Sequence, residues 1–181
     1  MHIPLTKIMH DLLKPHLNQS AMVIDATCGN GNDTCFLARH AKEVYAFDIQ
    51  KTAIENTKLA LKKAQLDNVR VIHDSHENLA LYLVQDVTAV IFNLGYLPKG
   101  SKAITTTKET TLSALAVALE IVKPKGLISI MLYPGHQEGK SETEAVLKWV
   151  KSLPKTSFDV LSIEKYLDEN APKGLLIQKK G

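Results

Sequence analysis

The segment Val23-Ile24-Asp25-Ala26-Thr27-Cys28-Gly29-Asn30-Gly31-Asn32-Asp33 decides the fold. A short apolar run ends on Asp25 and passes into a turn with two glycines. Asp33 then opens a helical stretch that runs to His40. A strand, a glycine turn and a helix N-terminus in that order are typical of a site for an adenosine-type cofactor, because glycines let the backbone approach a ligand where a Cβ would collide.

The charges around this turn discriminate between cofactors. A dinucleotide site offers bare amides to a pyrophosphate and carries a third glycine three residues after the second. Thr34 stands at that position, and the carboxylates of Asp25 and Asp33 flank the turn. Two carboxylates repel a pyrophosphate but suit an ammonium and a sulfonium, so we expect S-adenosylmethionine as the cofactor. The alternative is a structural glycine turn with a helix cap at Asn32 or Asp33.

Length and composition place the chain in a broad class. Its 181 residues, 45% hydrophobic and 23% charged, predict one globular domain over residues 1–181. No apolar run is long enough to span a bilayer and the N-terminus lacks a signal-peptide core, so we expect no membrane association and a cytoplasmic location. Cys28 and Cys35 are not expected to form a disulfide. A net charge of +3 permits a nucleic-acid partner without requiring one.

Strand-like and helical segments alternate along the chain. Apolar spacing in residues 3–17 predicts an N-terminal helix, assigned to residues 1–18, that packs on the domain. Further helices are expected at 33–40, 52–64, 77–83, 106–122 and 141–153, and strands at 21–27, 43–49, 69–74, 87–94, 127–133, 158–166 and 175–179. Lys123-Pro124-Lys125-Gly126 is a helix stop signal.

Repeated strand-helix units with apolar strands predict a mostly parallel sheet covered by helices on both faces. The last two strands have no helix between them and should form an antiparallel hairpin. This α/β layout, with seven strands and a C-terminal hairpin, is that of the Rossmann-like class I S-adenosylmethionine-dependent methyltransferase fold.

In such a sheet the ligand lies outside the carboxyl ends of the central strands. Asp48 ends the second strand, where a carboxylate accepts hydrogen bonds from a ribose diol. Asp74 ends the third strand and is expected to accept a hydrogen bond from the adenine amino group. Helix capping is the alternative for Asp48 and for Ser75. The expected cofactor contacts are Asp25, Cys28, Gly29, Asn30, Gly31, Asn32, Asp33, Asp48, Ile49, Gln50, Asp74, Ser75, His76 and Asn93.

The fourth strand runs into Asn93-Leu94-Gly95-Tyr96-Leu97-Pro98-Lys99-Gly100, the end that faces the transferred methyl group in this fold. Methyl transfer is an in-line displacement in which positioning supplies much of the catalysis. The Asn93 amide oxygen and the carbonyl of Leu94 or Gly95 suit the N–H groups of a nitrogen nucleophile, and Tyr96 suits stacking on a planar base. The alternative is a polar turn that leaves a buried strand.

The fifth strand ends in Tyr133-Pro134-Gly135-His136. His136 is a candidate base for removing a proton from an ammonium substrate, although a histidine in such a loop is often only solvated. The histidines and cysteines do not reproduce a metal-ligand spacing, so we expect no metal. Lysines near this edge that suit phosphate contact are Lys99, Lys102, Lys108, Lys140, Lys148, Lys151 and Lys155.

These motifs together resemble the small bacterial YtqB-like methyltransferases, which were first labelled rRNA methylases. The resemblance covers nearly the whole chain. The segments most particular to this family are Asn93-Leu94-Gly95-Tyr96-Leu97-Pro98 and Tyr133-Pro134-Gly135-His136. In the first of them, Asn-Leu-Gly-Tyr replaces the Asn-Pro-Pro-Tyr motif that is common in amino methyltransferases. The other parts are 25–34, 47–50 and 73–77.

The resemblance implies methylation of the aminomethyl nitrogen of 5-aminomethyl-(2-thio)uridine at the wobble position of tRNA, giving the methylaminomethyl base. We therefore expect Asn93, Leu94, Tyr96 and His136 to be catalytic, and Tyr96, Pro98, Lys99, Tyr133 and His136 to contact the substrate. The expected partners are the tRNA anticodon stem-loop and a second copy of the chain in a homodimer. Other readings are methylation of rRNA or of a small amine on the same fold, an NAD-dependent protein, and a nucleotide- or RNA-binding protein without turnover.

Overall fold

The computed structural model describes residues 4–82, 86–95, 106–168 and 170–181. Tyr96, Pro98, Lys99 and Lys102, for which the sequence predicts contacts, lie outside these residues. The α-helices are α1 (Leu5–Leu13), α2 (Asn32–His40), α3 (Lys51–Ala64), α4 (Lys108–Ile121) and α5 (Gln137–Lys151), and the 3₁₀ helices are η1 (Lys14–His16) and η2 (His76–Leu81). The strands are β1 (Met22–Asp25), β2 (Glu43–Asp48), β3 (Val69–His73), β4 (Val87–Asn93), β5 (Val122–Leu132), β6 (Phe158–Ile163) and β7 (Lys173–Lys179).

The strands form one seven-stranded sheet in the order β3-β2-β1-β4-β5-β7-β6. The first five of these strands in that order are parallel, while β7 runs antiparallel to both β5 and β6. The chain order reverses between β1 and β4, which is the switch point where ligands bind in open α/β sheets. The sheet and its terminal hairpin confirm the fold class that the sequence predicts.

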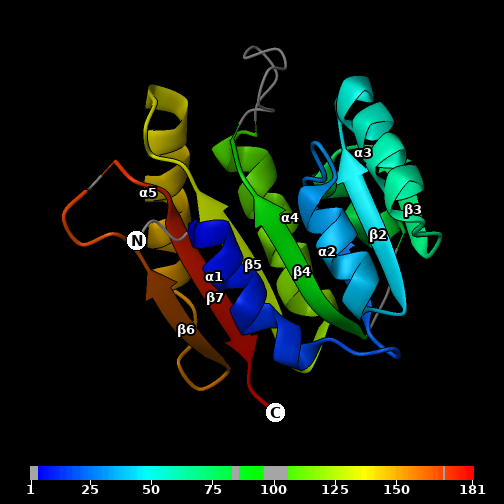
Figure 1. The fold of residues 1–181 in the computed structure, drawn as a ribbon. Helices are drawn as coiled ribbons and strands as arrows, with labels where there is room; N and C mark the ends of the chain where they lie inside the picture. Colours follow the sequence, from blue (N-terminus) through cyan, green and yellow to red (C-terminus); the bar gives the residue numbers. More distant parts are fainter. Residues whose placement is uncertain (1–3, 83–85, 96–105, 169) are drawn as a thin grey trace.

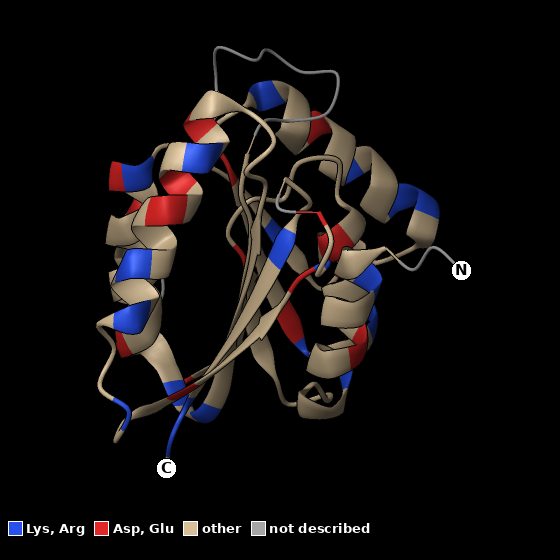
Figure 2. Ribbon diagram, turned by 90° about the vertical axis from the view of Figure 1, so that its left-hand side faces the viewer, with Lys and Arg blue, Asp and Glu red and all other residues tan. Residues whose placement is uncertain are grey.

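Helices cover both faces of the sheet (Figure 1). When the sheet is seen edge-on, it lies between two helical layers, with α1, α2 and α3 in one layer and α4 and α5 in the other (Figure 2). The central strands are buried on both faces, and residues 87–92 of β4 are buried throughout. One core cluster, which includes Phe47, Phe92 and Leu115, packs under α4, and a second, which includes Leu13, Leu37 and Ile91, packs under α1 and α2. This packing fixes the carboxyl ends of the strands.

Two boundaries differ from the sequence-based expectation in a way that bears on the site and the sheet. The Lys123–Gly126 segment ends α4 as predicted, but it is already part of β5. The register shifts there from Val87 opposite Val122 to Ala89 opposite Leu127, and Lys125 adopts φ 65°. A β-bulge absorbs the extra residues, so this stop signal does not require a separate loop.

The second difference is that α5 begins at Gln137 and not at residue 141. His136 is its N-cap: Nδ1 of the ring accepts a hydrogen bond from the Gly139 amide at 3.0 Å. In the part of the chain that the structure describes, no helix has the length and apolar content needed to cross a membrane.

Candidate active site

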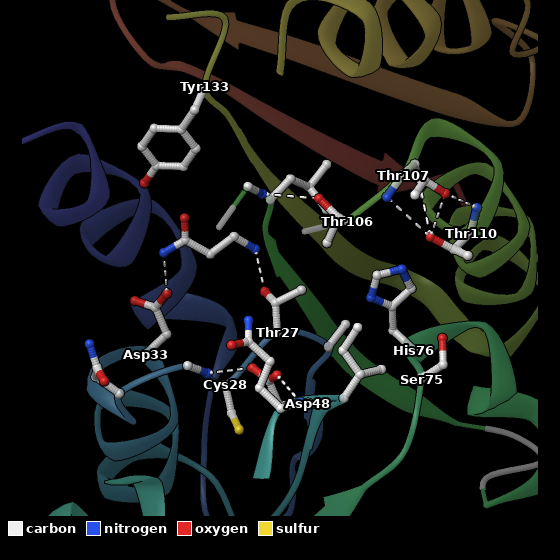
Figure 3. A pocket seen from close by; sticks show the side chains of 18 of the residues that line it. Thr27, Cys28, Asp33, Asp48, Ser75, His76, Thr106, Thr107, Thr110 and Tyr133 are labelled. Atoms are coloured by element: carbon white, nitrogen blue, oxygen red, sulfur yellow. Dashed lines mark hydrogen bonds between the residues drawn. The ribbon is translucent and has the colours of Figure 1, made fainter. Parts of the chain in front are cut away.

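A cavity of about 750 Å³ lies at the carboxyl ends of the parallel strands. This is within the usual size range of a small-molecule or cofactor site. In Figure 3, Asp33 and Tyr133 lie on one side of the pocket, and His76 with Thr107 and Thr110 lies on the other. Predicted site residues that line it are Cys28, Gly29, Asn30, Asn32, Asp33, Asp48, Ile49, Gln50, Ser75, His76, Asn93, Leu94, Tyr133 and His136.

The glycine turn after β1 is fixed from both sides. The Gly29 amide donates to Asp48 Oδ2 at 3.0 Å, and the Thr57 hydroxyl of α3 donates to the Gly29 carbonyl at 3.1 Å. Gly31 adopts φ 81°, and a Cβ there would lie 3.0 Å from Thr57 Cα. Gly31 therefore serves the close packing of α3 and does not itself line the pocket.

Asp25 is placed differently from the sequence-based expectation. Its side chain is fully buried beneath the turn, where Oδ2 accepts from the Thr34 hydroxyl at 2.6 Å and Oδ1 from the Thr27 amide at 3.2 Å. Burial, followed by the nearby charge of Asp33, raises the pKa of Asp25 to about 7. Asp25 does not line the pocket. It supports the turn from below and is not placed to contact a ligand in the pocket.

Asp48 faces the pocket, and its carboxylate also organises the loop after β2. Oδ1 accepts from the Gln50 amide at 2.9 Å while Oδ2 holds Gly29. Burial raises the pKa of Asp48, and the backbone hydrogen bonds partly offset this. Each oxygen keeps a further lone pair for a hydroxyl donor.

Asp74 does not line the pocket, in contrast to the prediction. Its carboxylate accepts from Asn78 Nδ2 at 2.8 Å and from the Tyr82 hydroxyl at 2.7 Å, and these bonds lower its pKa. Local partners in the turn after β3 therefore satisfy this side chain. Ser75 caps η2, which was the alternative for that residue: its hydroxyl accepts from the Glu77 amide at 3.4 Å.

His76, the first residue of η2 after β3, is well placed to meet a ligand. Its side chain is 7% exposed and packs edge-on against Phe92, with ring centroids 6.0 Å apart. Nε2 is buried and has no hydrogen-bond partner among the described residues. Burial lowers the pKa of His76, so the ring is neutral at physiological pH.

Asn93, at the end of β4, is held by side chains from the turn after β1 and from α2. Its amide N–H donates to the Thr27 hydroxyl at 2.7 Å, and Nδ2 donates to Asp33 Oδ2 at 3.0 Å. Tyr133 lies beside this pair. Burial and the charge of Asp33 raise the pKa of the Tyr133 phenol to about 12, and a hydrogen bond with Asn93 partly opposes this shift. The phenol is therefore protonated at neutral pH.

His136 lines the pocket as a helix cap. Because Nδ1 accepts from the Gly139 amide, the neutral ring carries its proton on Nε2. A base acting through Nδ1 would break the cap. Glu138 Oε2, 3.4 Å from the same nitrogen, pairs with it only when the ring is protonated. The geometry therefore does not support the predicted role as a base.

Sequence reasoning missed several lining residues, which are Ala26, Thr27, Glu77, Thr106, Thr107, Thr110, Gly135, Asn170 and Pro172. Asn170 and Pro172 precede β7. Because β7 is antiparallel to β5, its first residues lie at the edge where the parallel strands end. The predicted antiparallel hairpin therefore implied that the residues before β7 lie near the site. The Thr107-x-x-Thr110 pattern is likewise readable as a capping box, which the structure contains.

The sheet order, the glycine turn and a pocket at the switch point define a class I methyltransferase fold. The chain belongs to the family described as "Putative rRNA methylase", whose model matches residues 44–179. The predicted family resemblance is thereby confirmed.

Three relatives show how far the similarity extends. A "putative rRNA-methylase" from Clostridium thermocellum is 39% identical with a TM-score of 0.93, covering 99% of this chain and 100% of that one. A "putative methyltransferase" from Streptococcus mutans, solved in complex with SAH (S-adenosylhomocysteine), is 37% identical with a TM-score of 0.91, covering 99% of each chain. The chloroplastic tRNA (mnm(5)s(2)U34)-methyltransferase of Arabidopsis thaliana is 40% identical over 163 residues. That match includes 82% of this chain and 60% of the relative.

Proposed function

We propose that this chain is an S-adenosylmethionine-dependent N-methyltransferase that converts 5-aminomethyl-(2-thio)uridine at the tRNA wobble position into 5-methylaminomethyl-(2-thio)uridine. The observation that carries the substrate assignment is the 40% identity to the Arabidopsis tRNA (mnm(5)s(2)U34)-methyltransferase. The similarity to the Streptococcus mutans protein solved with SAH supports the cofactor assignment. The geometry of the pocket supports both.

The pocket residues fit S-adenosylmethionine in size and in charge. The cavity of about 750 Å³ leaves room for a methyl acceptor beside the cofactor. Its acidic lining residues are Asp33, Asp48 and Glu77, and no Lys or Arg lines it among the described residues. Such a lining favours a cationic ligand over a pyrophosphate.

Individual contacts follow from the side chains that face the cavity. The turn around Gly29 and Asp33 would hold the amino-acid end of the cofactor, and Asp48 would accept from the ribose hydroxyls. The buried Nε2 of His76 would meet the edge of the adenine. When bound, S-adenosylmethionine supplies an electrophilic methyl group on a sulfonium.

Asn93 would position the attacking amine. Its Nδ2 donates to Asp33, and the amide oxygen, which has two lone pairs, would accept an N–H group of the substrate. An aminomethyl group is largely an ammonium at neutral pH, and the charge of Asp33 favours its entry. The amine then attacks after losing a proton to solvent, because His136 is committed to its cap.

The rim of the pocket supports an RNA partner. Lys108 begins α4, Lys140 lies in the first turn of α5, and Lys165 lies in the β6–β7 loop that also supplies Asn170. In the same loop Tyr166 is 96% exposed, which suits stacking of its ring on an unpaired base. By contrast, Lys148 and Lys151 lie in the last turn of α5. This helix runs away from the carboxyl edge of the parallel strands (Figure 1).

Mass spectrometry of tRNA nucleosides from cells that lack the protein tests the proposal. We expect 5-aminomethyl-(2-thio)uridine to accumulate and its methylated form to disappear, and both to recover when the gene is restored. Unchanged levels would rule out the tRNA assignment. The family description favours rRNA as the second candidate, and loss of a methyl group from rRNA in the same cells would support it. The homodimer and the cytoplasmic location stay predictions.

A further inference from the structure

The N-terminal helix α1 places the side chain of His10 beside Asp33, which lines the pocket. Asp33 Oδ2 holds the Asn93 amide, and Asp33 Oδ1 lies 2.7 Å from Nε2 of His10. An ionised carboxylate only accepts hydrogen bonds, so Nε2 of His10 carries a hydrogen and its N–H group donates the hydrogen bond to Asp33. The side chains of His10 and Asp33 are only 22% and 12% exposed, which limits competition from water.

The position of His10 is itself well fixed. Its ring stacks on Phe36 with centroids 3.9 Å apart and an interplanar angle of 3°. The neighbouring Met9 is 2% exposed and packs against Gly174 of β7, where a Cβ would lie 2.6 Å from Met9 Sδ. The missing side chain at residue 174 therefore lets α1 approach the sheet closely and brings His10 to Asp33.

We propose that His10 is a positioning residue: by holding Asp33 it fixes the orientation of the Asn93 amide toward the methyl acceptor. The side chains of Asn and Asp rotate readily about their last torsion, and the two ends of the Asn amide have opposite hydrogen-bonding character. With one oxygen bound by His10, the other oxygen of Asp33 stays aimed at Asn93 Nδ2, so the Asn93 oxygen faces away from Asp33. The catalytic consequence rests on the proposed function.

A matched pair of variants tests this role. His10→Gln keeps an N–H donor at similar reach, whereas His10→Met has a similar length and helix propensity without the donor. We expect His10→Met to lower kcat roughly 10-fold, with little change in SAH affinity measured by calorimetry, and His10→Gln to recover most of kcat. His40→Met is the control, because His40 also packs on Phe36 but its Nδ1 lies 2.8 Å from the Phe36 carbonyl oxygen and not beside Asp33.

Two further readouts separate positioning from a general structural effect. In an Asn93→Ala background, His10→Met should lower kcat no further, because the two residues act through one contact chain. In ¹⁵N-labelled protein without substrate, the side-chain amide signals of Asn93 should shift or broaden in His10→Met but not in His40→Met. This second readout does not depend on turnover.

The outcomes distinguish the two proposals. Equal losses of kcat in His10→Met and His40→Met, or an undiminished effect of His10→Met in the Asn93→Ala background, would overturn the role of His10. Unchanged Asn93 amide signals in His10→Met would overturn it as well, whether or not His10→Met folds as stably as the wild type. A wild-type protein that methylates none of the tested amines, but whose Asn93 signals respond to His10, would instead remove the proposed function.

Discussion

Glu142 Oε2 accepts a hydrogen bond from the Thr106 hydroxyl at 3.0 Å, and this contact ties α5 to the segment that follows β4. The same hydroxyl oxygen accepts from the Gly95 amide at 3.0 Å, two residues after Asn93. Glu142 Oε1 accepts from Thr111 of α4 at 2.7 Å. Burial raises the pKa of Glu142, and the two hydroxyls oppose this. A buried carboxylate therefore connects the end of β4 with two helices.

Replacing Glu142 with leucine should cost both stability and turnover. Thr106 and Thr111 would lose a buried acceptor, so we expect the free energy of unfolding in urea to fall by roughly 1–3 kcal/mol. We expect kcat to fall as well, since Glu142 no longer holds the Thr106 hydroxyl that accepts from the Gly95 amide. Glu144→Leu on the exposed face of the same helix is the control. Equal effects of the two substitutions would contradict this role.

Asp25 should make stability depend on pH. Its folded-state pKa is about 7, above the ordinary value of 3.8, so the folded state binds the proton more tightly. The contribution is fully present below pH 3.8 and is lost as pH rises to about 7. Asp25→Asn mimics the protonated form and should raise the free energy of unfolding at pH 8 by roughly 1–3 kcal/mol, with little change at pH 4.

Urea unfolding of both proteins from pH 4 to pH 8 measures this difference. Asp11→Asn, at an exposed ion pair with Lys7, should leave the pH dependence unchanged. Parallel curves for wild type and Asp25→Asn would show that the buried carboxyl titrates normally.

Gly139 and Gly135 should respond differently to an added methyl group. Gly139 lies inside α5, where helix propensity alone favours alanine by about 1 kcal/mol. A Cβ there would lie 2.1 Å from the Tyr133 carbonyl oxygen and 2.8 Å from the His136 ring. Gly139→Ala should therefore lower the melting temperature, whereas Gly135→Ala, whose Cβ meets only an oxygen at 3.7 Å, should change it little. A higher melting temperature for Gly139→Ala would contradict the close approach.

RNA binding should depend on where a lysine lies along α5. Lys140→Glu, at the pocket rim, should weaken binding of an anticodon stem-loop and reduce its salt dependence, because a phosphate contact is lost. Lys148→Glu makes the same charge change two turns further along the helix and should have little effect. Fluorescence anisotropy at several salt concentrations measures both. Equal weakening would indicate a general charge effect and no defined interface.

Much of the site was predictable because one rule, ligands at the carboxyl ends of parallel strands, placed Asp48, His76 and Asn93 around one pocket. The rule could not assign side-chain directions. Asp25 turns beneath the chain toward Thr34, and Asp74 toward Tyr82, because local donors satisfy both. The contact of His10 with Asp33 spans 23 residues and depends on how α1 packs on β7, which helical periodicity does not encode.

Transfer of a labelled methyl group tests the central claim most directly. Purified protein is incubated with methyl-labelled S-adenosylmethionine and tRNA that carries 5-aminomethyluridine at the wobble position, and the nucleosides are then separated. We expect the label on the exocyclic nitrogen of that uridine, and we expect Asn93→Ala to lose at least 10-fold in rate while it still binds SAH. Absence of label from the wobble nucleoside, with SAH binding intact, would contradict the proposed activity.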